Sequence, residues 1–186
     1  MSMATPSARV NRGPAAADDN RRAILSAARR VFAERGYRVP LNAIAREAGV
    51  GQGVLYRHFP ARLDLALAVF EDNFAVLETL AADPDSGAFA RLWSRLVELT
   101  IETSAFVEMV IDARENFPEY RGHARLADLV EATLPRAQRA GLADVGLETD
   151  DVLLAWRMAF GVVVTTADRA QVRPAVTRAL SLLPLP

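Results

Sequence analysis

The stretch LNAIAREAGVGQGVLYRHFPAR, residues 41–62, predicts two short helices joined by a tight turn. A small residue at Ala45 lets the second helix cross the first closely, and Gly49 lets the backbone leave the first helix with positive φ. The apolar contacts that fix the crossing angle are expected from Ile44, Val50 and Leu55. This spacing is that of a helix-turn-helix, whose later helix enters the DNA major groove. Because any compact helical hairpin can show it, the residues that follow decide the interpretation.

The second of these helices is predicted from Gln52 to Phe59, with Leu55 and Phe59 facing the core because they are four residues apart. The opposite side then points toward DNA and carries Gln52, Gly53, Tyr56 and His58. The Gln52 amide can pair with adenine at two places, so it is the best candidate for reading a base. Arg57 either reads guanine or binds phosphate.

The segment AGVGQGVLYRHFPARLDL, residues 48–65, closely resembles the end of the DNA-binding domain of the TetR family of bacterial repressors. The resemblance extends over residues 40–65. It implies that Tyr56 and His58 contact phosphate, since a phenol or an imidazole N–H can donate to a phosphate oxygen. For His58 a hydrogen bond to a local carbonyl is the alternative. Arg62 occupies a helix start where the family usually has lysine, which predicts a phosphate docked there. Pro40 and Gly51 replace a threonine and a serine that are common in relatives, so two further phosphate contacts are in doubt.

Charge is divided unevenly along the 186 residues, although the net charge is only −1. Residues 1–64 hold 11 arginines against five acids, a balance of +6, whereas residues 65–186 hold 11 arginines against 18 acids, a balance of −7. A basic head on an acidic body suits a head that meets a polyanion. Chance clustering of solvated charges is the alternative.

Several classes of protein are disfavoured by composition. The absence of cysteine excludes disulfides and thiolate metal sites, and two histidines disfavour an imidazole site, so no metal and no cofactor are expected. No apolar run approaches the ~18–20 residues of a membrane span, and the N-terminus lacks a secretion signal. We therefore expect a cytoplasmic protein without membrane association. No catalytic constellation is recognisable, and an enzyme is not expected.

The chain is predicted to be all-α, with about nine helices in two domains. Residues 1–17 are expected to be a disordered tail, in which Arg9 and Arg12 either form a minor-groove arm or stay solvated. Residues 18–64 form the three-helix DNA-binding domain, whose first helix starts at residues 18–20 and ends at Gly36. Residues 65–186 form a ligand-binding and dimerisation domain.

Within the body, the fourth helix is expected over residues 61–82, and a sixth helix over residues 104–116. A helix over residues 120–140 should be kinked or divided by Pro135. Thr149 or Asp150 should cap an eighth helix that reaches about residue 168, and Pro174 should start a ninth that ends at Leu183.

Residues 134–158 also resemble the TetR-family body, more loosely, and that resemblance implies a small-molecule sensor. The candidates for lining a pocket, for each of which core packing is the alternative, are Phe74, Trp93, Phe106, Met109, Arg114, Phe117 and Trp156. The eighth helix is apolar on more than one side, which favours a homodimer, and the resemblance implies a four-helix bundle about a two-fold axis. A central helix of a monomeric body is the alternative. The interface is predicted at Trp156, Phe160, Val163, Val164, Leu180 and Leu183.

These features predict a sequence-specific regulator of transcription that binds double-stranded operator DNA at an inverted repeat. A repressor released by an unknown small-molecule effector is the leading hypothesis. A DNA-binding regulator without a ligand is the second, and a helical enzyme that carries this head is the third.

Overall fold

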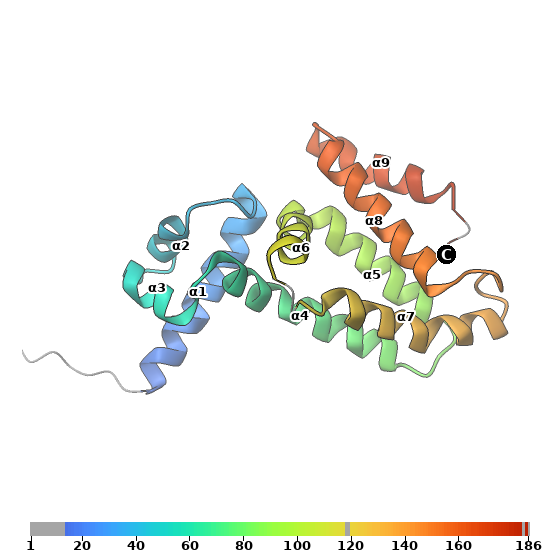
Figure 1. The fold of residues 1–186 in the computed structure, drawn as a ribbon, viewed down its shortest axis with the longest axis horizontal. Helices are drawn as coiled ribbons and strands as arrows, with labels where there is room; N and C mark the ends of the chain where they lie inside the picture. The colour runs from blue at the N-terminus through green and yellow to red at the C-terminus, as the bar shows by residue number, and fades with distance from the viewer. Residues whose placement is uncertain (1–13, 118–119, 184, 186) are drawn as a thin grey trace, which may run out of the picture.

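The computed structural model describes residues 14–117, 120–183 and 185. Within these residues the protein forms nine α-helices and no strand, so the all-α prediction is confirmed. In Figure 1, α1–α3 form a head at one end, α5–α9 form a body at the other, and α4 runs from one into the other. The helices are α1 Pro14–Arg35, α2 Leu41–Glu47, α3 Gln52–His58, α4 Arg62–Ala82, α5 Ala88–Glu102, α6 Ser104–Asn116, α7 Gly122–Arg139, α8 Thr149–Thr165 and α9 Arg169–Leu180.

The turn between α2 and α3 has the predicted construction. Gly49 has φ +68°, in the left-handed region that costs other residues backbone strain. Its N–H donates to the Arg46 carbonyl at 3.1 Å, and the Val50 N–H donates to the Ala45 carbonyl at 3.0 Å. Ala45 and Leu55 are buried at the crossing. The two short helices are thereby fixed against each other and against α1.

Two predicted helix starts differ from the structure. Helix α1 begins at Pro14 rather than at residues 18–20, because proline fits the first turn of a helix, where its missing N–H costs no bond. Residues 1–13, including Arg9 and Arg12, lie outside the described residues. Helix α9 begins at Arg169, five residues before Pro174, and the Asp168 carboxylate caps it by accepting from the Ala170 N–H at 2.9 Å.

Helices α7 and α8 also correct the sequence predictions. Helix α7 continues through Pro135 without division. The proline stands in the last turns of the helix, and the carbonyl of Glu131 that loses its intrahelical partner belongs to an exposed residue, which water can solvate. Helix α8 has Glu148 as its N-cap, ahead of both predicted residues, and the Glu148 N–H donates to the Asp151 carboxylate at 3.0 Å.

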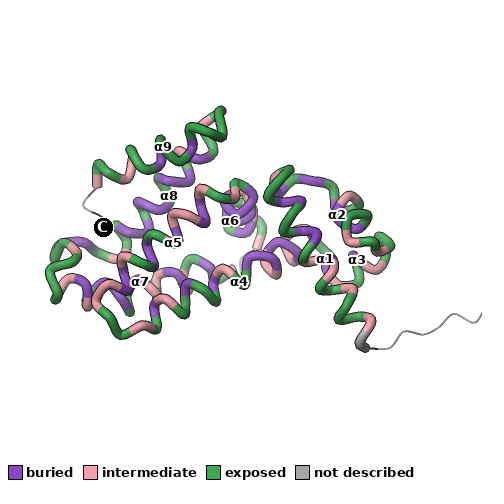
Figure 2. Tube along the Cα trace, turned by 180° about the vertical axis from the view of Figure 1, so that it is seen from behind, coloured by how far each residue is buried: buried purple, intermediate pink, exposed green. Residues whose placement is uncertain are grey.

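A continuous core joins the head to the body, and buried positions run along one side of each helix (Figure 2). Its large side chains include a series of neighbouring rings that starts in the head and ends in α8. The ring centroids of Phe32 and Phe70 are 6.5 Å apart, and those of Phe70 and Phe106 are 5.2 Å apart. The series continues to Trp156 and Phe160. Head and body are therefore packed as one unit through α4.

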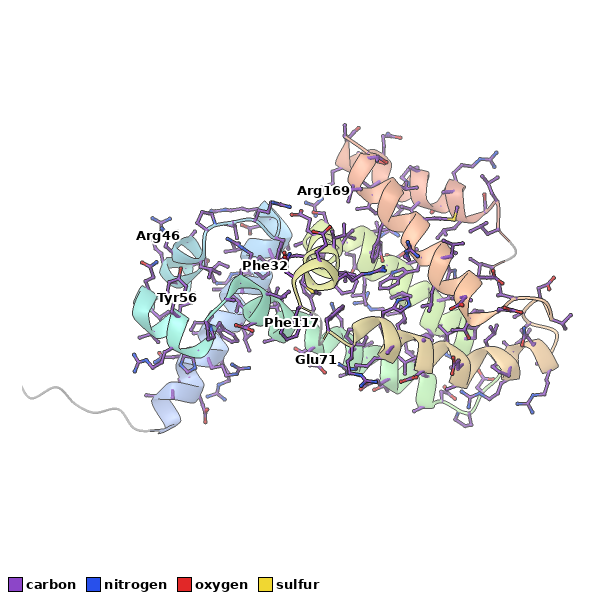
Figure 3. The ribbon with its side chains drawn as sticks, viewed as in Figure 1. Phe32, Arg46, Tyr56, Glu71, Phe117 and Arg169 are labelled. Atoms are coloured by element: carbon purple, nitrogen blue, oxygen red, sulfur yellow. The ribbon has the colours of Figure 1, made fainter. Side chains whose placement is uncertain are left out.

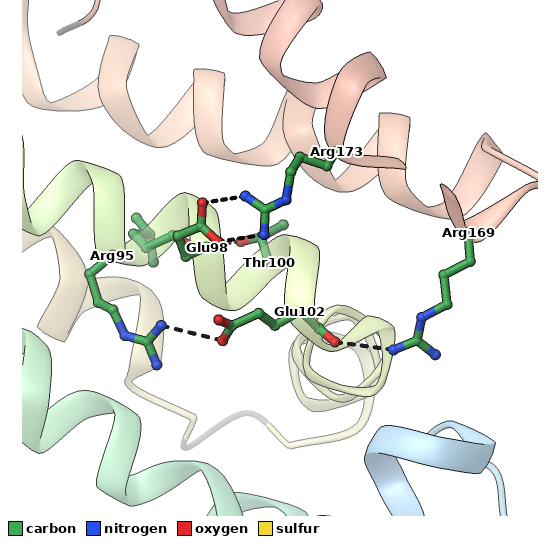
Figure 4. A network of polar contacts seen from close by, with 7 residues as sticks. Arg95, Glu98, Thr100, Glu102, Arg169 and Arg173 are labelled. Atoms are coloured by element: carbon green, nitrogen blue, oxygen red, sulfur yellow. Dashed lines mark hydrogen bonds and ion pairs between the residues drawn. The ribbon is translucent and has the colours of Figure 1, made fainter. Parts of the chain in front are cut away.

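Polar contacts tie α9 to the rest of the molecule (Figure 4). The Arg173 guanidinium binds the Glu98 carboxylate of α5 through two hydrogen bonds of 2.5 and 2.7 Å. Arg169 donates to the Glu102 carbonyl of α5 and to the Ala33 carbonyl of α1, both at 3.4 Å. One residue at the start of α9 thus contacts both the body and the end of the first head helix.

Candidate nucleic-acid interface and effector pocket

Helix α3 presents a polar side to solvent. Gln52, Gly53, Tyr56 and Arg57 are exposed and His58 is half-buried. On the other side Leu55 and Phe59 are buried, as the four-residue spacing predicts. Figure 3 shows Tyr56 on the outer side of the head, away from the body, and Arg46 on α2 also lies on the outer part of the head. The geometry brings the predicted DNA-contacting residues of α3 together; their contact with DNA stays a prediction.

Arg62, the first residue of α4, has partners that sequence reasoning missed. Its Nη1 donates to the Tyr37 carbonyl at 2.7 Å and also to the Val39 carbonyl. The guanidinium carbon lies 5.6 Å from the centroid of the Tyr37 ring. Arg62 therefore fastens the loop between α1 and α2 to the start of α4. Its predicted phosphate contact remains untested, and any such contact has to coexist with these bonds.

Tyr37 joins the head to the body and was not singled out from the sequence. Its ring is buried, and its hydroxyl donates to the Asp112 carboxylate of α6. Burial first, and then the hydrogen bond to Asp112, raise the pKa of Tyr37 above its ordinary value of 10. Asp112 also accepts from the Asn116 amide at 2.8 Å. No local pattern links two residues 75 positions apart, so the sequence held no signal for this contact.

Three of the seven predicted pocket residues meet at one cavity. Phe74, Met109 and Phe117 line a space of about 190 Å³ between α4, α6 and the start of α7. Leu67 and Phe70 add to its apolar wall. Its remaining lining residues are Glu71, Tyr120, Arg121, Gly122 and Arg125. Figure 3 labels two of the lining residues, Glu71 on α4 and Phe117 after the end of α6.

The remaining predicted pocket residues lie elsewhere. Phe106 and Trp156 belong to the buried aromatic series, where the Trp156 indole N–H donates to the Thr100 hydroxyl at 3.0 Å. Trp93 borders a separate groove between α5 and α9. Arg114 is exposed on α6 and lines none of these spaces. For these four positions the structure favours core packing or solvent exposure over a shared pocket.

An ion-pair network forms part of the cavity wall. Arg125 donates to the two Glu71 carboxylate oxygens at 3.0 and 2.9 Å and to Glu78 at 2.7 Å. These bonds, led by those to Glu71, raise the pKa of Arg125 above its ordinary value. The guanidinium carbon lies 4.4 Å from the centroid of the Phe74 ring, within the range of a cation–π contact. Arg125 is therefore held by two carboxylates and an aromatic face at once.

The predicted dimer residues divide into two groups. Trp156, Phe160 and Val163 are buried within the single chain because α8 packs them against α5 and α6, so they cannot form a free surface. Val164 is 54% exposed, and Leu180 and Leu183 are half-buried. The outward side of α8 instead carries Leu154 and Met158, which are 51% and 45% exposed. Burial within one chain removes Trp156, Phe160 and Val163 as free interface residues, and an interface on this helix stays a prediction.

The described residues hold neither a membrane-spanning helix nor a cluster of side chains that could bind a metal. No helix among them is long and apolar enough to cross a bilayer. No group of three histidine, aspartate or glutamate residues lies together as a metal site would require within the same part of the chain. The geometry defines a helical protein with a helix-turn-helix head, in which the polar side of α3 is exposed.

Comparison with known proteins agrees with this class. Residues 24–69 match the family model described as bacterial regulatory proteins, tetR family. The chain is 46% identical over 55 residues to the HTH-type transcriptional activator FasR of Mycolicibacterium smegmatis, a match that covers 29% of this chain and 25% of the activator. The matched segment thus spans about a quarter of that relative's length.

Solved structures resemble the whole chain. A TetR transcriptional regulator from Streptomyces coelicolor is 28% identical, with a TM-score of 0.56 over 89% of this chain and 98% of that one. A gamma-butyrolactone receptor shares the fold at 24% identity, with a TM-score of 0.60 over 92% of this chain and 90% of that one. Residues 24–69 therefore carry the DNA-binding domain of the tetR family model, and the solved structures that share the fold over most of the chain include a TetR transcriptional regulator.

Proposed function

We propose that this protein is a homodimeric repressor that binds an inverted-repeat operator and leaves it when a small effector binds the body. The observation that carries the proposal is the two-sided α3, with Leu55 and Phe59 anchored in the core and Gln52 and Tyr56 exposed. A helix held in this way can enter the major groove without unfolding part of the head. A regulator of transcription works where the chromosome is, so cytoplasmic localisation forms part of the proposal.

In this proposal Gln52 reads a base edge, and Tyr56, Arg57 and His58 position the head on the phosphate backbone. The excess of arginine in the head supports attraction to DNA. Two heads related by a two-fold axis present two copies of α3, which is why the operator is expected to be an inverted repeat.

The test is a DNA-binding titration at several salt concentrations with specific and random duplexes. Gln52→Ala should weaken specific binding by about 1–3 kcal/mol at one base pair of each half-site and leave random DNA nearly unaffected. Arg57→Ala should weaken binding to both duplexes and lower the slope of log K against log salt by roughly 0.9 if it contacts phosphate. Arg139→Ala, an equal charge loss on α7, is the control and should leave both unchanged. Equal losses for Arg57→Ala and Arg139→Ala would contradict a DNA-facing α3.

Dimerisation is proposed through the outward side of α8 together with α9, using Leu154, Met158 and Val164. Burying such a side chain stabilises by about 1.5–3 kcal/mol, and two-fold symmetry counts each contact twice. Met158→Asp should therefore give folded monomers by light scattering. The buried Phe160→Asp should instead unfold the body. A Met158→Asp protein that stays dimeric would move the interface elsewhere.

A regulator without a ligand is the second candidate, and one observation favours it. The cavity at Phe74, of about 190 Å³, is smaller than the ~300–1,000 Å³ of typical ligand sites, whereas the groove at Trp93, of about 380 Å³, reaches that range. Reporter transcription from the operator, measured with and without a metabolite extract, separates the two candidates and also decides between repression and activation. Enzymatic activity is not expected of a protein whose relatives are regulators.

A further inference from the structure

A cationic side chain of the protein, the Arg125 guanidinium, lines the cavity beside α4 and is bound there by other side chains. Arg125 lies over the Phe74 ring at 4.4 Å and donates three hydrogen bonds to Glu71 and Glu78. Contact with an aromatic face and paired N–H donors to a carboxylate are how proteins bind planar cations. The site therefore has the chemistry of a receptor for a planar cation, with Arg125 in the position of the ligand.

This arrangement is exchangeable because its members are near water. The side chains of Arg125, Glu71 and Glu78 are 35%, 60% and 49% exposed. Ion pairs at such exposure contribute little to stability, and a long arginine side chain is readily solvated when it moves away. Withdrawal of Arg125 would leave the apolar wall of Leu67, Phe70 and Met109 in place and enlarge the cavity at its mouth.

We propose that the effector of this protein is a small aromatic molecule bearing a planar cation of the amidinium or guanidinium class, which replaces Arg125 at Phe74 and Glu71. The inference rests on the effector role proposed above and specifies its chemistry. The ring of the effector lies among the apolar side chains, and its cation binds Glu71. A single ring with a short substituent is the size that about 190 Å³ admits.

Arg121 and Arg125 both line the cavity, so its net charge does not decide between a cation and an anion. The cost of breaking the bonds of Arg125 to Glu71 and Glu78 decides instead. An anion that bound Arg125 would displace Glu71 and leave its carboxylate close to Glu78 without the shared cation, and like charges at that distance repel. A bound cation would take the place of the Arg125 guanidinium. The Glu71 and Glu78 carboxylates would then keep a positive partner while Arg125 moves into water. The exchange with a cation is therefore the less costly of the two.

The test uses three molecules of nearly equal shape: benzamidine, which is cationic, benzamide, which is neutral, and benzoate, which is anionic. Each is titrated by calorimetry into the full chain without DNA. Benzamidine should bind at least ten-fold more tightly than benzamide, and benzoate should not bind detectably. Tighter binding of benzoate, or no binding of any of the three, would overturn the proposal.

Variants test the named residues. Glu71→Gln should weaken benzamidine at least ten-fold, whereas Glu131→Gln, an equal charge change on the exposed side of α7, should leave it unchanged. Arg125→Ala should strengthen benzamidine several-fold because the competing guanidinium is gone. Arg125→Ala keeps the test decisive if Glu71→Gln proves unstable. Weaker binding of benzamidine to Arg125→Ala than to the wild type would contradict the exchange.

The proposed function is tested separately, by operator binding without any probe. If the protein binds operator DNA but not benzamidine, the cation inference fails while DNA binding stands. If benzamidine binds in the Glu71-dependent manner yet leaves operator affinity unchanged, the cation pocket stands and the effector role is lost.

Discussion

The head and the body of this protein are held together in different ways. In the head, two seven-residue helices depend on one glycine turn and on contacts with α1, because helices this short have little stability of their own. In the body, helices of 12–18 residues are positioned by apolar contacts between segments far apart in sequence. The head can thus be recognised from a short run of residues, whereas the arrangement of the body depends on the whole chain.

The difference does not make the two regions independent. Phe32 of the head stacks against Phe70, which also borders the cavity of the body. Tyr37 and Arg169 add polar links across the same junction. A change on either side of this junction therefore has a physical route to the other, and substitutions in matched pairs can measure how strongly the two regions are joined.

The largest effects are expected from cavities in the two cores. Leu55→Ala in the head and Leu96→Ala in the body each remove a buried side chain and should cost about 2–5 kcal/mol of unfolding free energy. Urea unfolding, followed by circular dichroism, should show one transition that shifts to lower urea for both variants. A second, separate transition in Leu55→Ala would mean that the head unfolds alone.

The Tyr37 hydroxyl should contribute the next largest effect. Tyr37→Phe removes its hydrogen bond to a carboxylate and should cost about 1.5–3 kcal/mol below pH 10. Because the pKa of Tyr37 is higher in the folded state than its ordinary value of 10, the folded protein keeps the proton longer. That stabilisation is present below pH 10 and is lost as the pH rises above it.

The alkaline loss of stability gives a control for the Tyr37 assignment. The chain has three tyrosines, and burial also raises the pKa of Tyr120. In thermal melts from pH 8 to 11, the melting temperature should therefore fall less steeply with pH in Tyr37→Phe than in the wild type. In Tyr120→Phe the part of the fall that is due to Tyr37 should remain. Identical pH profiles in the wild type and Tyr37→Phe would remove this link between head and body.

A smaller effect is expected at the turn. Gly49→Ala places a Cβ at φ +68°, with no atom within 4 Å, so backbone strain of about 1–2 kcal/mol is the only cost. Gly51→Ala is the matched control, since φ there is −67° and the space is also open. It should be neutral or stabilise slightly by restricting the unfolded chain. Equal melting temperatures for the two variants would contradict the role of the left-handed turn.

The smallest effect should come from the ion pair between α5 and α9. Glu98→Gln removes the partner of Arg173 on an exposed surface, where salt screens the interaction. Binding of Arg173 lowers the pKa of Glu98, so its contribution is present above the ordinary value of 4.5 and is lost as the pH falls. The difference in urea midpoint between wild type and variant should be small at pH 7 and vanish in high salt. A midpoint difference that survives in high salt would indicate a role beyond charge pairing.

The accuracy of sequence-based prediction followed the distinction between local contacts and contacts between residues far apart in the sequence. The positive φ of Gly49 and the burial of Ala45 and Leu55 were predictable because a turn and a helix spacing are local. The partners of Arg62 were not, since the carbonyls it binds lie 23 and 25 residues earlier and carbonyls carry no sequence signature. Trp156 was assigned to the dimer because its helix is apolar on more than one side. Its packing against Phe106 and its bond to Thr100, 56 residues away, hold it inside the single chain.

Tyr37 has a consequence for the construction of hybrid regulators. One residue of the head both donates to Asp112 through its side chain and accepts from Arg62 through its backbone. A head transplanted onto a foreign body carries its own glycine turn and its Arg62, but it leaves Asp112 behind. Such a chimera would read its operator with a head that lacks one of its anchoring points. In a hybrid regulator built as a biosensor, the junction should therefore lie after α6 rather than inside α4, so that Asp112 is transferred together with the head.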